Sequence, residues 1–363
     1  MNTSRKNLKN NLATFFTVGT FLVCSTAQAG WTVWNNAGGN GLWSDADNWS
    51  GSVPDASSDA AIINGFSTLG AVTALAGSND SFDYLRVGHL DSGKLIINGA
   101  NLSTTASSQT REGIGYDAGH TGVLDLMSGS MSFSTPTNKT NQTTSIAGVG
   151  ATGTVNQTGG TMNFGGLNTN SVTLGSNNGT GLYNFTAGAI TTRRAFNITT
   201  GGSGSSIFQV NGYDASSSIQ IGGMAVDEVG GLGDGAWLQG AGTTLSLGID
   251  GGSSEGTTLI NIGLGSDEDA NDNDGKAVFA SGSILDLGFN SGAQLGTWTV
   301  LSAAGGIVDN GLTLAPEDVG NWSFAVVGND LQVTALAIPE PSSLALMAVV
   351  GCALLITRRR LKA

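Results

Sequence analysis

The chain has 363 residues, of which 11% are charged, and 57 are glycines, more than twice the usual share. The formal net charge is −13, and the stretch between the two basic ends carries seven basic against 26 acidic residues, a net charge of −19. So acidic a body repels nucleic acid, which excludes nucleic-acid binding. The only cysteines, Cys24 and Cys352, lie in apolar terminal segments, which excludes a disulfide framework and a cysteine-ligated metal site.

Residues 1–29 have the pattern of a secretory signal peptide. Three basic residues among the first nine precede an apolar stretch, Leu12–Cys24. Small residues at Ala27 and Ala29 predict cleavage before Gly30 by signal peptidase. Two alternatives remain: an uncleaved anchor, and a lipoprotein modified at Cys24, although the preceding valine does not suit lipoprotein processing.

Residues 30–83 form a distinct head that contains four of the seven tryptophans: Trp31, Trp34, Trp43 and Trp49. Exposed aromatic rings could stack on sugars. A row of stacked repeats also needs a sealed end, and bulky indole rings would cover it. We therefore predict an N-terminal Trp-rich cap, with sugar stacking as the alternative.

Four similar units follow in residues 84–200. Each has a turn that ends in a glycine, and these glycines are 29, 31 and 28 residues apart: Gly93, Gly122, Gly153 and Gly181. Two residues after each glycine comes an apolar residue: Leu95, Leu124, Val155 and Tyr183. Apolar and polar residues then alternate with the period of a β-strand that has one buried face.

None of these units can bury its apolar face alone, but stacked units share a continuous core. The pattern therefore predicts an all-β fold of the parallel β-helix type, a β-solenoid with about one coil per unit. The alternative is a β-sandwich with recurring hairpins. Residues 201–306 keep alternating strands between glycine turns, and we expect wider, less regular coils there. Residues 307–337 read as C-terminal capping strands, with a hairpin at Val326–Asp330.

Residues 338–363 contain three parts in order. The first is the triplet Pro339, Glu340 and Pro341, the second is the apolar run Leu344–Ile356, and the third is a basic cluster of Arg358, Arg359 and Arg360. A helix of 13 residues spans ~20 Å, short for a bilayer core of ~30 Å. With tolerated polar ends and snorkelling arginines it becomes a marginal transmembrane helix whose arginines stay cytoplasmic.

These three parts, in this order, resemble the PEP-CTERM sorting signal. The resemblance implies that an exosortase, a membrane cysteine transpeptidase, recognises the triplet and processes the tail. The protein would then be anchored transiently in the inner membrane and end in the cell envelope or extracellular matrix. The prolines also keep Glu340 extended and presentable to an enzyme. A plain C-terminal anchor is the alternative. The repeats and the tryptophan-rich opening resemble those of autotransporter (type V secretion) passengers and PEP-CTERM-associated proteins.

The two histidines, His89 and His120, lie in glycine-flanked turns of adjacent units. Two imidazoles could hold a metal ion. They are out of register relative to their glycines, so we expect exposed turn residues and no metal site.

An acidic run near residue 270 offers oxygen ligands of the kind that Ca²⁺ prefers: Asp267, Asp269, Asn271, Asp272 and Asp274. The EF-hand spacing fails, because alignment on Gly275 places Ala270 and Ser281 at the first and last ligand positions. A solvated acidic loop is the prediction, and weak calcium binding the alternative.

No motif for catalysis is present: the chain has no G-x-S-x-G, no HExxH and no P-loop lysine. Five charged residues could converge across two coils, as a polysaccharide lyase or hydrolase requires: Asp83, Asp91, Arg111, Glu112 and Asp117. Their spacing does not demand it. We therefore predict no enzyme and no cofactor, and an exported structural or adhesive protein whose partner could be an extracellular polysaccharide. A polysaccharide-acting enzyme and a calcium-dependent matrix binder are the alternatives.

Overall fold

The computed structural model describes residues 30–105, 112–133, 143–165, 171–199, 204–211, 217–222, 235–251, 259–264 and 275–338. The regular secondary structure in this part of the chain is almost all β-strand, and the exceptions are a 3-10 turn, η1 (Ala46–Asn48), and one short helix, α1 (Phe66–Leu69). The predicted all-β class is therefore confirmed. Across these residues, no helix has the length and apolar character to cross a membrane. The predicted signal peptide, sorting tail and calcium ligands lie outside the described residues.

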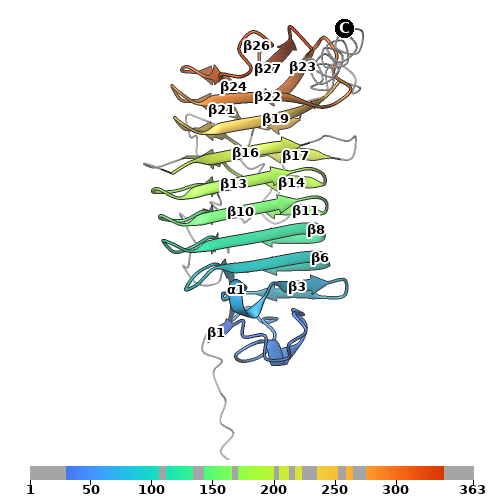
Figure 1. Ribbon diagram of the computed structural model, residues 1–363, viewed down its shortest axis with the longest axis vertical. Helices are drawn as coiled ribbons and strands as arrows, with labels where there is room; N and C mark the ends of the chain where they lie inside the picture. Colours follow the sequence, from blue (N-terminus) through green and yellow to red (C-terminus); the bar gives the residue numbers. More distant parts are fainter. Residues whose placement is uncertain are drawn as a thin grey trace, which may run out of the picture.

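One sheet contains ten parallel strands, each hydrogen-bonded to the next. The layers of the molecule stack along its long axis (Figure 1). We call this sheet the ten-stranded sheet. Its strands, in order, are β1 (Gly30–Val33), β2 (Asp59–Ile63), β5 (Tyr84–Val87), β7 (Glu112–Ile114), β9 (Thr143–Ile146), β12 (Ser171–Leu174), β15 (Phe196–Ile198), β18 (Trp237–Gln239), β21 (Lys276–Phe279) and β24 (Gly306–Asp309).

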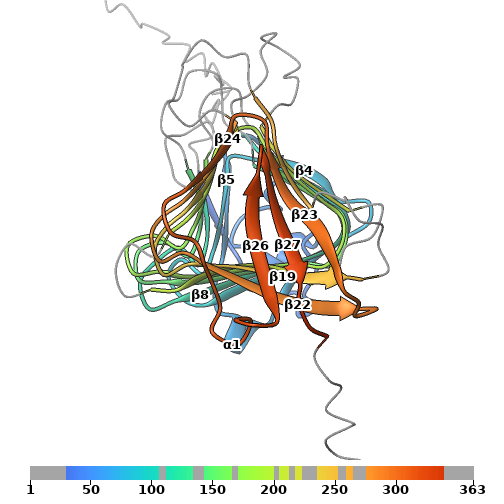
Figure 2. The same ribbon diagram turned by 90° about the horizontal axis from the view of Figure 1, so that it is seen from above.

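The remaining strands form a nearly closed sheet, which we call the mixed sheet, arranged in two parallel columns and ended by antiparallel strands. The first column comprises β3 (Val72–Leu75), β6 (Gly93–Thr104), β8 (Thr121–Phe133), β10 (Thr152–Gln157), β13 (Thr180–Phe185), β16 (Ser206–Asn211), β19 (Thr244–Asp250), β22 (Ile284–Ser291) and β25 (Thr313–Leu314). The second comprises β4 (Asn79–Phe82), the distal parts of β6 and β8, β11 (Thr161–Phe164), β14 (Ala189–Thr192), β17 (Ser218–Ile221), β20 (Ile260–Ile262) and β23 (Gly296–Ala303). Seen along the axis, successive layers superimpose in a three-sided outline (Figure 2).

The apolar residue that follows each repeat glycine forms a single file, as the sequence predicts. Leu95 pairs with Leu124, Leu124 with Val155, and Val155 with Tyr183, and all four are buried. The glycines stack beside them for a steric reason. A Cβ on Gly122 would lie 2.0 Å from the backbone nitrogen of Gly115, so only glycine fits where turn and strand meet.

Residues 201–306 continue the same stacking with longer units. Ile207 pairs with Thr244, 37 positions later, and Thr244 pairs with Ile284, 40 positions later. The units are longer, as wider coils would require, but apart from one register shift after Ile249 the pairing of these strands is regular, so the expected loss of regularity is not seen in the described strands. The additional residues fall between strands, largely in segments outside the described residues.

The N-terminal head covers one end of the stack. Trp34 and Trp43 each pack edge-on against Trp49, with ring centroids 5.2 and 4.9 Å apart, and all three indoles are buried. The Trp43 indole nitrogen donates to Asp80, which ties the head to β4. The burial of these three rings fits a cap and leaves no face for a sugar, whereas Trp31 is 51% exposed. Stacking itself begins within residues 30–83, because β2, β3 and β4 already pair with β5 and β6.

The opposite end is closed by an antiparallel hairpin. Strands β26 (Trp322–Val327) and β27 (Asp330–Ala335) pair with each other, and β27 also pairs with β23. The hairpin predicted at Val326–Asp330 is therefore confirmed. The rings of Phe289 and Trp322 pack 4.8 Å apart beneath it and contribute to sealing the core.

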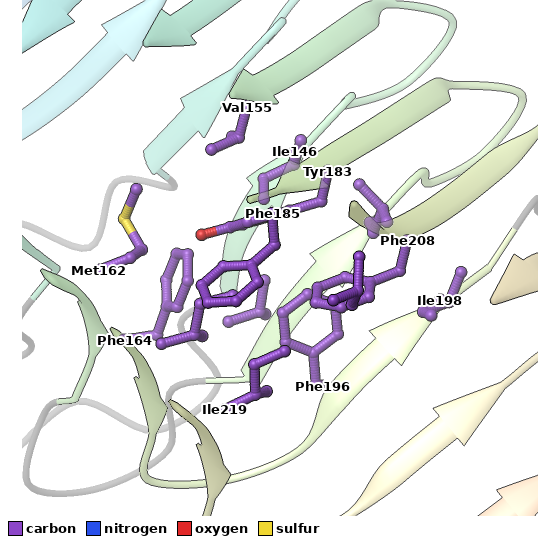
Figure 3. Close-up of a cluster of buried hydrophobic side chains, with 14 of the residues drawn as sticks. Ile146, Val155, Met162, Phe164, Tyr183, Phe185, Phe196, Ile198, Phe208 and Ile219 are labelled. Atoms are coloured by element: carbon purple, nitrogen blue, oxygen red, sulfur yellow. The ribbon is translucent and has the colours of Figure 1, made fainter. Parts of the chain in front are cut away.

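The core is one continuous cluster of buried aliphatic and aromatic side chains between the sheets. Figure 3 shows the part of it around Phe208. Phe208 is central to it: its ring lies 5.2 Å from those of Tyr183 and Phe196, and 5.3 Å from Trp237. The buried Tyr183 hydroxyl donates to the Gln157 side chain over 2.7 Å, which satisfies its polar end. Burying each such side chain contributes about 1.5–3 kcal/mol.

Candidate functional site

A cluster of aromatic and charged side chains lies at the N-terminal end of the ten-stranded sheet. Its members, which we call the Arg86 cluster, are Trp31, Tyr84, Arg86, His89, Tyr116 and Asp117. Arg86 points outward because Leu85 and Val87, its neighbours on β5, point into the core. Its guanidinium carbon lies 4.1 Å from the Tyr116 ring centroid, 4.9 Å from that of Tyr84 and 6.0 Å from that of Trp31. Cation–π attraction thus holds several elements together.

His89 connects two charged members of this cluster. Its Nε2 lies 3.2 Å from an Arg86 guanidinium nitrogen, and its Nδ1 lies 2.7 Å from an Asp117 carboxylate oxygen. Burial and the Arg86 charge lower the pKa of His89, against an opposing effect of Asp117. The neutral imidazole can accept from Arg86 through Nε2, and its Nδ1 lies against the Asp117 carboxylate. Since Nε2 is engaged, this histidine is not placed to accept a proton from a substrate.

The prediction that His89 is an exposed turn residue is wrong, because its side chain is buried, with 8% exposure for the residue. The Asn64 side chain accepts hydrogen bonds from the backbone amides of His89 and Leu90, which holds the turn against the sheet. His120 is half-buried. Among the described residues, no three or more His, Cys, Asp or Glu side chains gather closely enough to hold a metal ion.

The carboxylates considered for catalysis separate into different environments. Asp83 and Glu112 are buried, Asp117 belongs to the Arg86 cluster, and Asp91 is exposed and accepts from the Ser92 backbone amide. Arg111 lies outside the described residues. These four side chains therefore do not converge on one groove, and the possibility that they do so is wrong.

Glu112 is the most perturbed of these groups. Burial raises its pKa to about 8, while hydrogen bonds from Thr104 and Thr144 oppose this rise and the nearby Asp83 charge adds to it. Its side chain lies on the core side of the sheet, since Ile114, two residues later, also points inward and Gly113 between them faces out. Glu112 is thus a protonated core carboxyl at neutral pH, and it does not face the outer surface.

The outer surface of the ten-stranded sheet is hollowed by two cavities that share Thr173, with volumes of about 530 and 420 Å³. Their floor is a file of outward-facing residues from five successive strands: Ser145, Thr173, Asn197, Leu238 and Val278. We call this feature the sheet groove. It crosses the strands along the long axis, and the Arg86 cluster stands at one end of it, where Tyr116 and Asp117 line the first cavity.

The polar groups on the groove floor have capacity for hydrogen bonding. Within the described part of the chain, the side chains of Ser145, Thr173 and Asn197 make no hydrogen bond with another residue. The outer face of the mixed sheet differs, because Asn184 donates to Asn156 and Asn156 to Asp125 in a ladder, and Asp125 also pairs with Lys94 at 2.7 Å. The side chains of the ladder hydrogen-bond to one another, whereas the polar side chains of the groove floor make no such bonds with other described residues.

The sequence carried one indirect sign of this site. Gly113 faces outward between charged and aromatic neighbours, and a Cβ there would lie 2.8 Å from the Tyr116 ring, so the glycine lets that ring lie against the sheet. Trp31 and Arg86 are 55 positions apart, and only the register of β1, β2 and β5 brings them together. Comparison of the chain with models of known protein families, with curated proteins and with solved structures gave no match.

Proposed function

We propose that this protein is an exported structural or adhesive component of the cell surface or extracellular matrix, and that its body is a parallel β-solenoid. The observation that carries the proposal is the uninterrupted parallel pairing from β1 to β24, with one apolar file inside. Each layer buries its apolar side chains against its neighbours, so the assembly behaves as one stiff rod. A rod with repeated side chains on its faces suits a spacer or an adhesive stalk.

The surface chemistry supports this role. The Asp125–Asn156–Asn184 ladder presents amides and carboxylates that are already hydrogen-bonded to one another. Such a face is rigid and hydrated, and the acidic body as a whole keeps neighbouring molecules apart.

The two terminal sequences supply the proposed route. Signal peptidase would cleave between Ala29 and Gly30, and the tail would hold the body outside the inner membrane until an exosortase acts at the Pro-Glu-Pro triplet. The mature protein would then reside in the envelope or matrix.

A polysaccharide-acting enzyme is the second candidate, because charged residues do gather beside a groove. Two features speak against it. Asp117, the one charged residue that lines either cavity in the described part of the chain, lies 2.7 Å from His89, and the strongly perturbed Glu112 faces the core. Hydrolysis of a glycosidic bond needs a pair of carboxyl groups flanking that bond. We therefore propose binding without catalysis.

The test is the location of the full-length protein and of a variant in which Pro339, Glu340 and Pro341 are replaced by alanine. We expect the wild type in the envelope or matrix, with a C-terminus shortened by processing in mass spectrometry, and the variant retained in the inner membrane. Ser342→Ala with Ser343→Ala is the matched control, which should sort like the wild type. Wild-type protein in the cytoplasm, or a triplet variant that sorts normally, would contradict the proposal.

A further inference from the structure

We propose that the sheet groove binds an extended, uncharged glycan chain laid across the strands, parallel to the long axis of the molecule. The proposal deepens the matrix role and rests on it, because it names the class of ligand that an adhesive body would hold. It concerns the outer face of the ten-stranded sheet, from Tyr116 to Val278.

The spacing of the floor residues favours a sugar chain. Adjacent parallel strands are ~4.8 Å apart, so the five floor positions from Ser145 to Val278 extend over about 19 Å. A pyranose ring in an extended chain advances about 5 Å, so each ring meets one strand, whereas an extended peptide rises only about 3.3 Å per residue and drifts out of register. A peptide would also find no strand edge, because the strands run across the groove.

The chemistry of the floor changes along the groove in a way that suits sugars. Ser145, Thr173 and Asn197 offer two hydroxyl groups and one amide without a partner in the described part of the chain, and these can pair with ring hydroxyls. Leu238 and Val278 follow with half-buried aliphatic side chains, against which the C–H faces of a pyranose can pack.

The charged residues around the groove favour a neutral glycan over an anionic one. Asp117 is the one charged residue among the described lining residues, and Arg86 is buried behind Tyr116. Among the described lining residues, no cationic side chain is therefore available to pair with a carboxylate or sulfate group. The acidic body also repels polyanions. This argues against uronate-rich and sulfated chains.

One end of the groove is aromatic and rigid. The Tyr116 ring packs against the Arg86 guanidinium at 4.1 Å and against the His89 ring at 5.2 Å. A ring held in this way loses little freedom on binding, and aromatic rings bury a large area at low entropic cost. We assign Tyr116 as the platform for the terminal sugar of the bound stretch.

The experiment is isothermal titration calorimetry of the full-length protein with neutral β-1,4-linked hexasaccharides of glucose, mannose and xylose, with the matching disaccharides and with hexagalacturonate. We expect at least one neutral hexasaccharide to bind about tenfold or more tightly than its disaccharide, because a longer chain meets more strands, and hexagalacturonate not to bind. In Thr173→Arg, the arginine obstructs the middle of the groove, and the affinity should fall about tenfold or more.

Thr154→Arg is the matched control, because Thr154 is also an outward, half-buried threonine in mid-strand, but on the mixed sheet. It should bind like the wild type. Leu238→Arg provides a second obstruction if Thr173→Arg does not fold. Absence of binding by every neutral hexasaccharide overturns the inference, as do preference for hexagalacturonate and undiminished binding in both groove variants.

These outcomes separate the inference from the proposed function. If the protein sorts to the envelope or matrix but binds no neutral hexasaccharide, the groove assignment fails and the structural role stands. If the protein is not exported, the proposed function fails whatever the calorimetry shows.

Discussion

The Nδ1 atom of His89 lies 2.7 Å from a carboxylate oxygen of Asp117, and this contact joins the turn after β5 to the turn after β7. Two successive layers are thereby fixed to each other outside the core as well as inside it. Because the histidine is buried, the stability of the N-terminal layers depends on pH, and the Asp117 contact opposes part of that dependence.

We expect stability to fall as the pH drops below about 6.5, the ordinary pKa of histidine. Burial lowers the pKa of His89, so below that pH the unfolded chain takes up a proton that the folded protein resists. The fall in Tm from pH 7 to pH 5, measured by circular dichroism, should be smaller in His89→Gln than in the wild type. His120→Gln is the control, and equal slopes in all three proteins would contradict the prediction.

Glu112 should make stability depend on pH in the opposite direction, and over a range that extends to higher pH. Burial raises its pKa from 4.5 to about 8, so the folded protein keeps a proton that the unfolded chain loses, and stability falls as the pH rises from 4.5 to about 8. Between pH 4.5 and about 8, the free energy of unfolding falls by about 5 kcal/mol. Glu112→Gln should reduce this slope in urea unfolding between pH 6.5 and 8.5, and the contribution of His89 is the same in both proteins because both retain it.

The matched control for Glu112 is Glu317→Gln, which makes the same chemical change at an exposed position. It should leave the slope in place. A Glu112→Gln protein with the wild-type slope would show that the carboxyl is ionised in the folded state.

Replacing a glycine that packs against the backbone of an adjacent layer should lower the free energy of unfolding far more than replacing a glycine with open space around it. Gly122→Ala places a Cβ 2.0 Å from the Gly115 nitrogen and 2.3 Å from the Val87 carbonyl, and we expect a loss of about 3 kcal/mol or more. Gly288→Ala, also in a strand, meets no atom within 4 Å and should change stability by less than about 0.5 kcal/mol. Similar losses in both variants would mean that the layers do not meet at Gly122.

Truncation of the aromatic core should unfold the middle layers first. Phe208→Ala leaves a cavity between Tyr183, Phe196 and Trp237, at a cost of about 3–5 kcal/mol. Leu182→Ala, on a neighbouring strand but half-buried and outward, should cost about 1 kcal/mol or less. Urea unfolding followed by circular dichroism gives the loss in each variant and distinguishes the two.

Calcium should have no effect on the body if the acidic run is a solvated loop. Saturating Ca²⁺ or EDTA should then move Tm by less than about 1 °C, because an ion that does not bind cannot shift the folding equilibrium. The calcium-dependent alternative predicts a rise in Tm. That rise would disappear when four carboxylates are changed to asparagine, at Asp267, Asp269, Asp272 and Asp274.

The sequence predicted those features that depend on local pattern. The Leu95–Tyr183 file and the hairpin at Val326–Asp330 follow from alternation and from glycines at regular spacing, which neighbouring residues determine. The register of successive layers then followed from matching one unit to the next.

The candidate site was not predictable in the same way. His89 was expected to be exposed because its flanking glycines are typical of turns, yet a side chain 25 positions earlier, Asn64, holds that turn against the sheet. The sheet groove combines single residues from five units whose local patterns differ. Such features depend on contacts between layers, and no one unit contains the information for them.

In-register stacking has a consequence for how the length of this protein can change. Inserting one more unit of about 30 residues would advance the far end by one strand spacing, ~4.8 Å, and leave every existing interface with the same neighbours except at the point of insertion. Evolution can therefore adjust the length of the molecule in small, even steps by adding or removing units.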